Sequence, residues 1–126
     1  MSKHATATVW RRFVFCAAHY LPGHPKCGQM HGHNYVVEVG IVGSVHDGMV
    51  IDFSDFKQMF EKFVHSRYDH RCLNDFEELM SIPTVENLAV AIAGILVHAL
   101  RPALFPRVQT VRVYETPNCW VEVEVS

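Results

Sequence analysis

The segment "HGHNYVVEVGI", residues 31–41, decides the fold, because its pattern is that of one long, half-buried β-strand. Side chains alternate between the two faces of a strand, so residues of equal parity share a side. One face therefore carries His31, His33, Tyr35, Val37, Val39 and Ile41. Since this face is mostly apolar, we expect it to be partly buried, with two histidines at one end.

A second strand is predicted just upstream, in "VWRRFVFCAAH", residues 9–19. One parity of this segment groups Phe13, Phe15, Ala17 and His19. The C-terminal segments "VQTVRVYE" and "WVEVEV" are joined by the turn "TPN" and predict a β-hairpin. In the last segment the valines at 121, 123 and 125 share one face and the glutamates at 122 and 124 the other, as in a half-buried antiparallel strand.

Two helices are predicted between these strand pairs. The first begins at a cap formed by Ser54 or Asp52, and the second follows Pro83 with Thr84 as its N-cap. The apolar positions with helical spacing are Phe56, Met59, Phe60, Phe63 and Val64 in the first helix, and Val85, Leu88, Ala89, Ile92, Leu96 and Ala99 in the second. The predicted order is β-β-α-α-β-β, an α+β fold in which an antiparallel sheet of about four strands carries two helices on one face.

Length and composition indicate one domain, residues 1–126, because 126 residues that are 49% hydrophobic suffice for a single core. A net charge of −2 without a run of Lys or Arg argues against a nucleic-acid partner. The longest apolar stretch, residues 88–100, falls short of the roughly 20 residues of a membrane span, and the N-terminus has no signal-peptide pattern. We expect a cytoplasmic protein with no membrane partner, and its four scattered cysteines to be reduced thiols.

Strand parity predicts that His19, His31 and His33 reach the same partly buried side at neighbouring strand ends. Three imidazoles that converge in this way are typical of Zn²⁺, and three protein ligands leave a fourth position open, as in catalytic zinc sites. Cys27, four positions before His31, offers an alternative: as the fourth ligand it would close a structural site that stabilises the fold. A third interpretation makes the histidines hydrogen-bonded core residues. The spacing alone leaves the role of Cys27 open.

Two acidic positions add candidate chemistry. Asp69 and His70 are adjacent in "YDHRCLND", where the carboxylate can orient an imidazole that transfers protons. The alternative is a loop at a helix end, in which both polar side chains only cap the helix and contact solvent. Glu115 shares its parity with buried valines and therefore needs a partner, either an internal arginine or a ligand with paired N–H groups. No chemistry is assigned to His4, His24, His46, His65, His98, Cys16 and Cys119.

Taken in order, several motifs make the chain resemble the 6-pyruvoyltetrahydropterin synthase / 6-carboxytetrahydropterin synthase family. These are "FVFCAAH", "CGQMHGHNY", "GMVIDF", "YDHRCLND", "PTVENLA" and "VYETP", which together cover most of the chain. The resemblance implies that His19, His31 and His33 bind zinc and that Cys27 is a catalytic base rather than a ligand. Departures from the family pattern fall at Cys16, Val85 and Tyr114, outside these residues.

The resemblance also assigns the acidic positions. It implies that Asp69 and His70 form a second proton-handling pair supplied by a neighbouring subunit, and that Glu115 anchors the 2-amino and N3 edge of a pterin. It further implies the tunnelling fold, in which subunits join into barrels as a homohexamer, a dimer of trimers, and so cover the open edges of the sheet. Triphosphate needs basic groups, for which Lys26, Arg67 and Arg71 are the candidates.

The position of the cysteine resembles the 6-carboxy branch of the family, which acts in queuosine biosynthesis. The implied activity is that of a zinc-dependent lyase that converts 7,8-dihydroneopterin triphosphate to 6-carboxy-5,6,7,8-tetrahydropterin and releases acetaldehyde and triphosphate. Formation of a 6-pyruvoyl product is the alternative within the family. A non-catalytic, zinc-stabilised binding domain is the alternative from another class.

Overall fold

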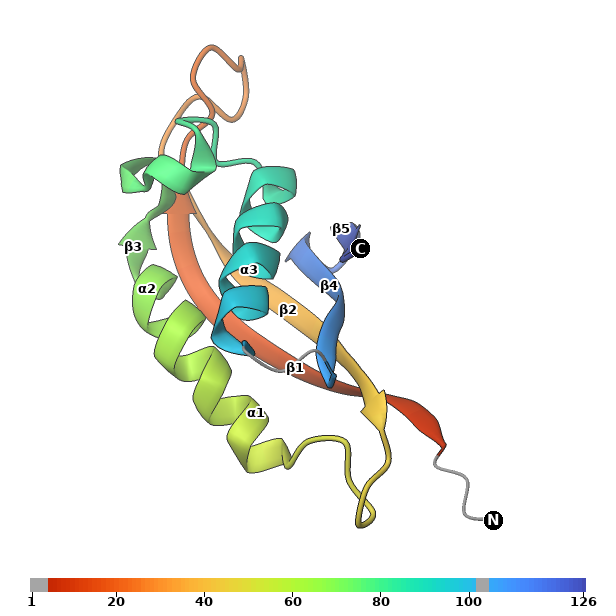
Figure 1. Cartoon of the computed structure of the whole chain (residues 1–126). Helices are drawn as coiled ribbons and strands as arrows, with labels where there is room; N and C mark the ends of the chain where they lie inside the picture. Colours follow the sequence, from red (N-terminus) through yellow and green to blue (C-terminus); the bar gives the residue numbers. More distant parts are fainter. Residues whose placement is uncertain (1–4, 102–104) are drawn as a thin grey trace.

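A computed structural model describes residues 5–101 and 105–126, which form a long curved sheet with helices on one face (Figure 1). The strands are β1 (Thr6–His19), β2 (His31–Ser44), β3 (Arg71–Cys72), β4 (Arg107–Thr116) and β5 (Cys119–Glu124). Their order in the sheet is β3-β1-β2-β4-β5. The α+β class and the order of the main elements are confirmed.

The sheet differs from the prediction in one respect: it is mixed and five-stranded rather than purely antiparallel with about four strands. The two-residue strand β3 pairs in parallel with β1 at Ala17 and Ala18, whereas β1–β2, β2–β4 and β4–β5 are antiparallel. So short a strand has no periodicity of its own, and it exists only because β1 offers it an edge.

Both predicted helices form. The first consists of α1 (Phe53–Phe60), a π-helical turn (Glu61–His65) and α2 (Ser66–Tyr68); the second is α3 (Val85–Ala99); and two short 3-10 turns, Leu73–Asp75 and Glu77–Leu79, lie between them. Asp52 caps α1 by accepting from the Ser54 N–H, and Thr84 caps α3 by accepting from the Asn87 N–H. No helix among the described residues is long and apolar enough to cross a membrane.

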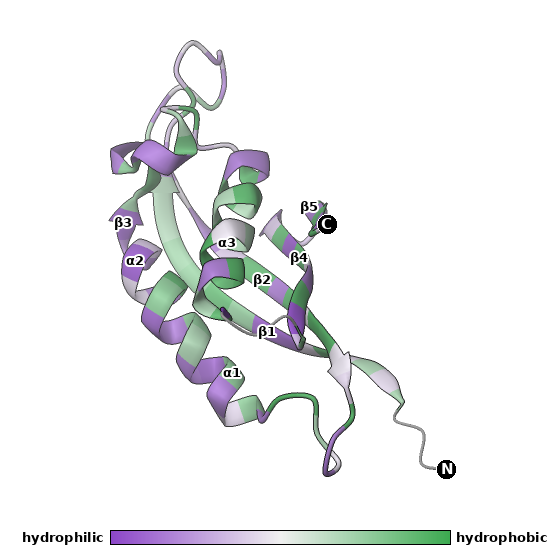
Figure 2. Cartoon of the chain, viewed as in Figure 1, coloured by the Kyte–Doolittle hydropathy of each residue, from purple (hydrophilic) through white to green (hydrophobic). Residues whose placement is uncertain are grey.

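The core lies between the sheet and the helices. Figure 2 shows the middle of α3 as apolar and its two ends as partly polar, whereas α1 alternates between polar and apolar positions along its length. On the sheet, the odd-numbered residues of β1 and β2 face this core, as their parity predicts, and Phe15, Tyr35 and Val37 are fully or almost fully buried. The rings of Phe13 and Phe60 stack with their centroids 4.0 Å apart, which joins α1 to β1.

A hydrogen-bonded network holds the segment after α2 in place. The Arg67 guanidinium donates to both carboxylate oxygens of Glu78, at 2.6 and 2.9 Å, and the Tyr68 hydroxyl donates to the same carboxylate at 2.8 Å. The hydrogen bonds from Arg67, the largest effect, lower the pKa of Glu78 to about 2. This network braces the helix end next to Asp69 and His70.

Phe60→Ala tests the core. Phe60 is fully buried, so we expect its truncation to lower the free energy of unfolding by about 3–5 kcal/mol, whereas Phe63→Ala, at a side chain that is 39% exposed, changes it by less than about 1 kcal/mol. Urea unfolding followed by circular dichroism measures both variants. Equal effects would contradict the packing described.

Glu78→Gln tests the network through pH. Because the pKa of Glu78 is lowered in the folded state, the carboxylate stabilises the fold above its ordinary pKa of 4.5, and this contribution is lost as pH falls towards 2. After allowance for partial exposure, we expect the variant to be less stable by about 1–2 kcal/mol at pH 7 and equal to the wild type near pH 2. A difference that stays constant across this range, measured by urea unfolding at each pH, would rule out the carboxylate as its cause.

Candidate metal centre and proton-transfer pair

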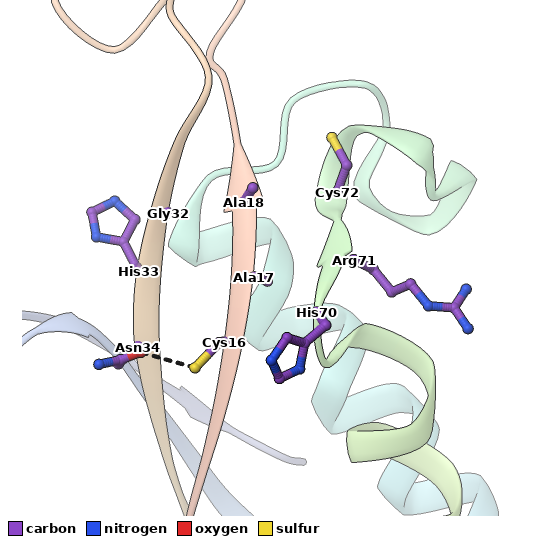
Figure 3. Close-up of a pocket in the computed structure, with 9 residues that line it drawn as sticks. All are labelled: Cys16, Ala17, Ala18, Gly32, His33, Asn34, His70, Arg71 and Cys72. Carbon is purple, nitrogen blue, oxygen red and sulfur yellow. Dashed lines mark hydrogen bonds between the residues drawn. The ribbon is translucent and has the colours of Figure 1, made fainter.

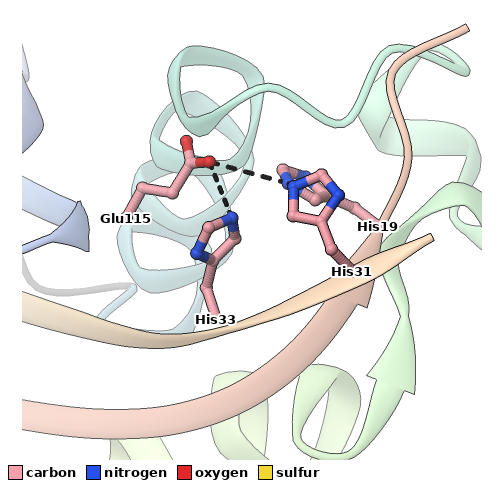
Figure 4. A group of neighbouring side chains, drawn as sticks. All are labelled: His19, His31, His33 and Glu115. Carbon is pink, nitrogen blue, oxygen red and sulfur yellow. Dashed lines mark hydrogen bonds and ion pairs between the residues drawn. The ribbon is translucent and has the colours of Figure 1, made fainter. Parts of the chain in front are cut away.

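The ends of β1 and β2 bring three histidines together, as strand parity predicts. His19, the last residue of β1, is the register partner of His31, the first residue of β2, and His33 lies two residues further along. The side chain of Glu115 reaches the same place from β4 (Figure 4). One donor atom from each of these four residues lies within 4.8 Å of all the others.

Backbone carbonyls fix how two of the imidazoles are oriented. The ring of His19 is hydrogen-bonded through Nδ1 to the Pro83 carbonyl, and the ring of His31 through Nδ1 to the Gln29 carbonyl, both at 2.8 Å. Because a carbonyl only accepts, each Nδ1 carries the hydrogen and each neutral ring has its lone pair on Nε2. The two Nε2 atoms lie 3.1 Å apart, so their lone pairs repel unless a proton or a cation lies between them. Metal-binding histidines are commonly oriented by such outer contacts.

The surroundings of His33 also fit a metal ion. Its Nε2 is buried and, among the described residues, has no hydrogen-bond partner with acceptable geometry, although Oε1 of Glu115 lies 2.9 Å away. Burial, the largest effect, lowers the pKa of His33, and this outweighs the raising effect of the Glu115 charge. His33 therefore favours the neutral form that a metal requires.

The donor set suits Zn²⁺. Nitrogen atoms bound to tetrahedral zinc at about 2.0–2.1 Å are roughly 3.3 Å apart, close to the 3.1 Å between the facing nitrogens of His19 and His31. Imidazole nitrogens and a carboxylate oxygen are ordinary zinc ligands. The residues present can therefore hold the ion that the sequence predicts.

Glu115 supplies the fourth donor of this group. Its Oε1 lies 2.9 Å from Nε2 of His33 and 3.6 Å from Nε2 of His19, and its side chain is 23% exposed. The partners of this half-buried carboxylate are thus histidines and not an internal arginine. From this position it can act as a fourth metal ligand or face a molecule that binds next to the metal.

Cys27 lies apart from the four-donor group, in the loop of residues 20–30 between β1 and β2. Its backbone N–H donates to Nδ1 of His24 at 2.8 Å, and its carbonyl accepts from the Leu21 N–H at 2.7 Å. The described residues therefore do not form the closed Cys-His₃ arrangement. His24 has no assigned chemistry from the sequence pattern; its position, three residues before Cys27 and next to "PG", is the signal that points to it.

Asp69 and His70 form a bonded pair. Oδ2 of Asp69 lies 2.7 Å from Nδ1 of His70, and Oδ1 accepts from the Cys16 N–H at 3.0 Å. The hydrogen bond from the Cys16 backbone, the largest effect, lowers the pKa of Asp69, so this side chain stays ionised and can orient the His70 ring. His65, a helical turn earlier, has its Nε2 3.7 Å from the same carboxylate and is a further contact that sequence analysis missed.

Within one chain, this pair contributes no donor atom to the four-residue histidine group. The His70 side chain is 79% exposed and lines a surface pocket of about 480 Å³, whose lining also includes Cys16, Arg71 and His33. In Figure 3, His70 lies beside β1 and His33 projects from β2, with the two strands between them. The two groups therefore share no donor atom, but His70 and His33 border the same surface pocket.

The basic candidates are not equivalent. Arg67 is engaged by both oxygens of Glu78. Arg71 lines the pocket beside His70, and Lys26 is exposed in the loop next to Cys27. Arg71 and Lys26 therefore remain the better placed of the three for an anionic ligand.

Comparisons with known proteins identify relatives of this chain. Residues 8–126 match the family model described as 6-pyruvoyl tetrahydropterin synthase. A protein of Archaeoglobus fulgidus, named provisionally as a 6-carboxy-5,6,7,8-tetrahydropterin synthase, is 43% identical over 110 residues, which cover 86% of this chain and 88% of that protein. The 6-pyruvoyl tetrahydrobiopterin synthase of Dictyostelium discoideum is 34% identical over 131 residues, with coverages of 92% and 94%.

A solved structure extends the match to three dimensions. The 6-pyruvoyl tetrahydropterin synthase of Caenorhabditis elegans superposes over the full length of both chains, with a TM-score of 0.87 at 29% identity. The chain thus has the tunnelling fold, and it belongs to the 6-pyruvoyl tetrahydropterin synthase family.

Proposed function

We propose that the protein is a zinc-dependent lyase that converts 7,8-dihydroneopterin triphosphate and water to 6-carboxy-5,6,7,8-tetrahydropterin, acetaldehyde and triphosphate. The observation that carries the proposal is the convergence of three imidazoles and one carboxylate at the strand ends of a pterin-synthase fold. The choice of the 6-carboxy product is supported by the relative of that name, which has the higher identity, 43% against 34% for the 6-pyruvoyl relative.

His19, His31 and His33 would hold the zinc ion. When bound, zinc supplies Lewis acidity, which polarises the hydroxyl groups of the substrate side chain and makes the neighbouring C–H bonds more acidic. In this proposal the Cys27 thiolate accepts a proton from the substrate. His70, oriented by Asp69, transfers protons on the opposite side of the side chain. Glu115 binds the paired N–H groups of the pterin edge and so fixes the substrate relative to these residues.

The proposal includes assembly into a homohexamer, a dimer of trimers. The Asp69–His70 pair contributes no donor to the histidine group of its own chain, which is consistent with a site completed by a neighbouring subunit. The sheet also supports assembly, because β5 ends it on one side and, on the other, β3 covers β1 only at Ala17 and Ala18. Open edges favour pairing with another strand.

The remaining parts of the proposal concern cellular context. We place the protein in the cytoplasm, in queuosine (7-deazaguanine) biosynthesis, with a small pterin triphosphate as its partner and with neither nucleic acid nor membrane. The competing 6-pyruvoyl product is supported by the Dictyostelium relative, and analysis of the product distinguishes the two reactions.

Cys27→Ala tests the proposed chemistry. A base that is not a metal ligand can be removed without loss of zinc, so we expect the variant to retain its zinc while kcat falls by about 100-fold or more. Zinc is measured by elemental analysis and the product by chromatography, with Cys119→Ala, an exposed thiol on β5, as the control. Loss of zinc together with the fold, with an inactive wild type, would instead support a structural zinc domain.

Glu115→Gln separates the two roles open to this carboxylate. If Glu115 binds the pterin edge, the variant retains zinc and its KM rises by about 10–100-fold, because a charge-assisted pair of hydrogen bonds is lost. His33→Ala, the matched variant within the same group, is expected to lose zinc. If Glu115→Gln loses zinc as His33→Ala does, Glu115 is a metal ligand and the proposed pterin contact is wrong.

A further inference from the structure

The loop of residues 20–30 joins the two strand ends that carry the histidines and contains Cys27. Hydrogen bonds to the N–H and to the carbonyl of Cys27 hold the loop backbone in a folded conformation. The Leu21 N–H donates to the Cys27 carbonyl at 2.7 Å, and Nδ1 of His24 accepts from the N–H groups of Cys27 and Lys26, at 2.8 and 3.2 Å. Both polar backbone groups of Cys27 are thus engaged within the loop.

The sequence "LPGHP" accounts for the position of the His24 ring. The His24 N–H donates to the Leu21 carbonyl at 3.1 Å, and Gly23 has a φ of +78°, as expected for a type II turn with proline and glycine at its centre. Pro25 restricts His24 to extended backbone and prevents a helix from continuing through it. The ring is thereby turned towards the N–H groups two and three residues later, as a capping side chain would be.

The chain packs closely around this arrangement. A Cβ atom added at Gly28 would lie 2.5 Å from the His24 carbonyl oxygen, a distance that only glycine permits without a shift of the backbone. The residues before and after Cys27, Lys26 and Gly28, therefore both lie against His24. In a loop this short, displacement of the Cys27 backbone displaces its thiol relative to the strand ends.

We propose that His24 is a positioning residue for Cys27: its ring nitrogen holds the Cys27 and Lys26 peptides and so fixes the thiol relative to the histidine group. The inference rests on the proposed function, in which Cys27 is the base. His24 itself touches no reacting atom in this account. Its contribution is geometric, and misplacement of a catalytic group by about 1 Å can lower a rate by about 100-fold.

Two substitutions of His24 test the proposal. His24→Ala removes the acceptor, whereas His24→Asn retains one, because Oδ1 of asparagine is as many bonds from Cα as Nδ1 of histidine and readily accepts from N–H groups two or three residues later. His98→Ala, on the last turn of α3, is the matched control. For the zinc-loaded proteins, the measurements are kcat and KM, zinc content, and deuterium exchange of the peptide that spans residues 21–28.

We expect His24→Ala to retain zinc, to exchange this peptide about 10-fold faster and to lose about 10- to 100-fold in kcat with little change in KM. His24→Asn should remain within about threefold of the wild type in kcat and in the exchange rate of this peptide, because it restores the acceptor. Unchanged exchange and kcat in His24→Ala would overturn the proposal. So would equal losses in His24→Ala and His24→Asn, because the ring would then act by some means other than accepting these hydrogen bonds.

Different results would contradict the positioning role of His24 and the proposed lyase function. If the wild type forms no 6-carboxytetrahydropterin, the function is wrong, and the positioning of Cys27 is then read from its alkylation by iodoacetamide, followed by peptide mass spectrometry. Faster alkylation of Cys27 in His24→Ala, with recovery in His24→Asn, supports the positioning role. Alkylation rates that are the same in all three proteins overturn it.

Discussion

The site depends on the register of β1 against β2, which sets His19 directly opposite His31. In an antiparallel pair, a slip by one residue would move the side chains of one strand to the other face of the sheet. His31 and His33 would then leave the core side while His19 stayed on it. The aromatic pair of Phe15 and Tyr35 lies in the same register, so the packing of the core and the convergence of the histidines are fixed by the same strand pairing.

That register brings two imidazole lone pairs close together, and a cation between them would remove their repulsion. Carbonyls hold the Nδ1 atoms of His19 and His31, which leaves two lone pairs facing each other at 3.1 Å. Burial disfavours the protonated form of His33, and the Glu115 carboxylate adds negative charge to the group. A group with these donors can hold a divalent metal ion. The Pro83 carbonyl that orients His19 immediately precedes Thr84, the cap of α3, so the start of this helix also supports the centre.

Elements with a periodic pattern could be predicted from the sequence, whereas contacts set by tertiary structure could not. Alternation along residues 31–41 places His31 and His33 on the core side, and the caps at Asp52 and Thr84 follow from local side-chain chemistry. The two-residue β3 depends on the exposed edge of β1, and the arrangement of Arg67, Tyr68 and Glu78 depends on how a loop folds back. The parity of Glu115 along its strand predicts which face of the sheet it lies on. It does not predict that its partners are histidines, because those lie on other strands.

The central claim is that three histidines bind zinc in an open site from which Cys27 is absent as a ligand. X-ray absorption at the zinc edge tests it most directly, because sulfur and nitrogen ligands differ in both distance and scattering. The account predicts only nitrogen and oxygen neighbours at about 2.0–2.2 Å in the zinc-loaded protein. A sulfur neighbour at about 2.3 Å that disappears in Cys27→Ala would contradict it and make the cysteine a ligand.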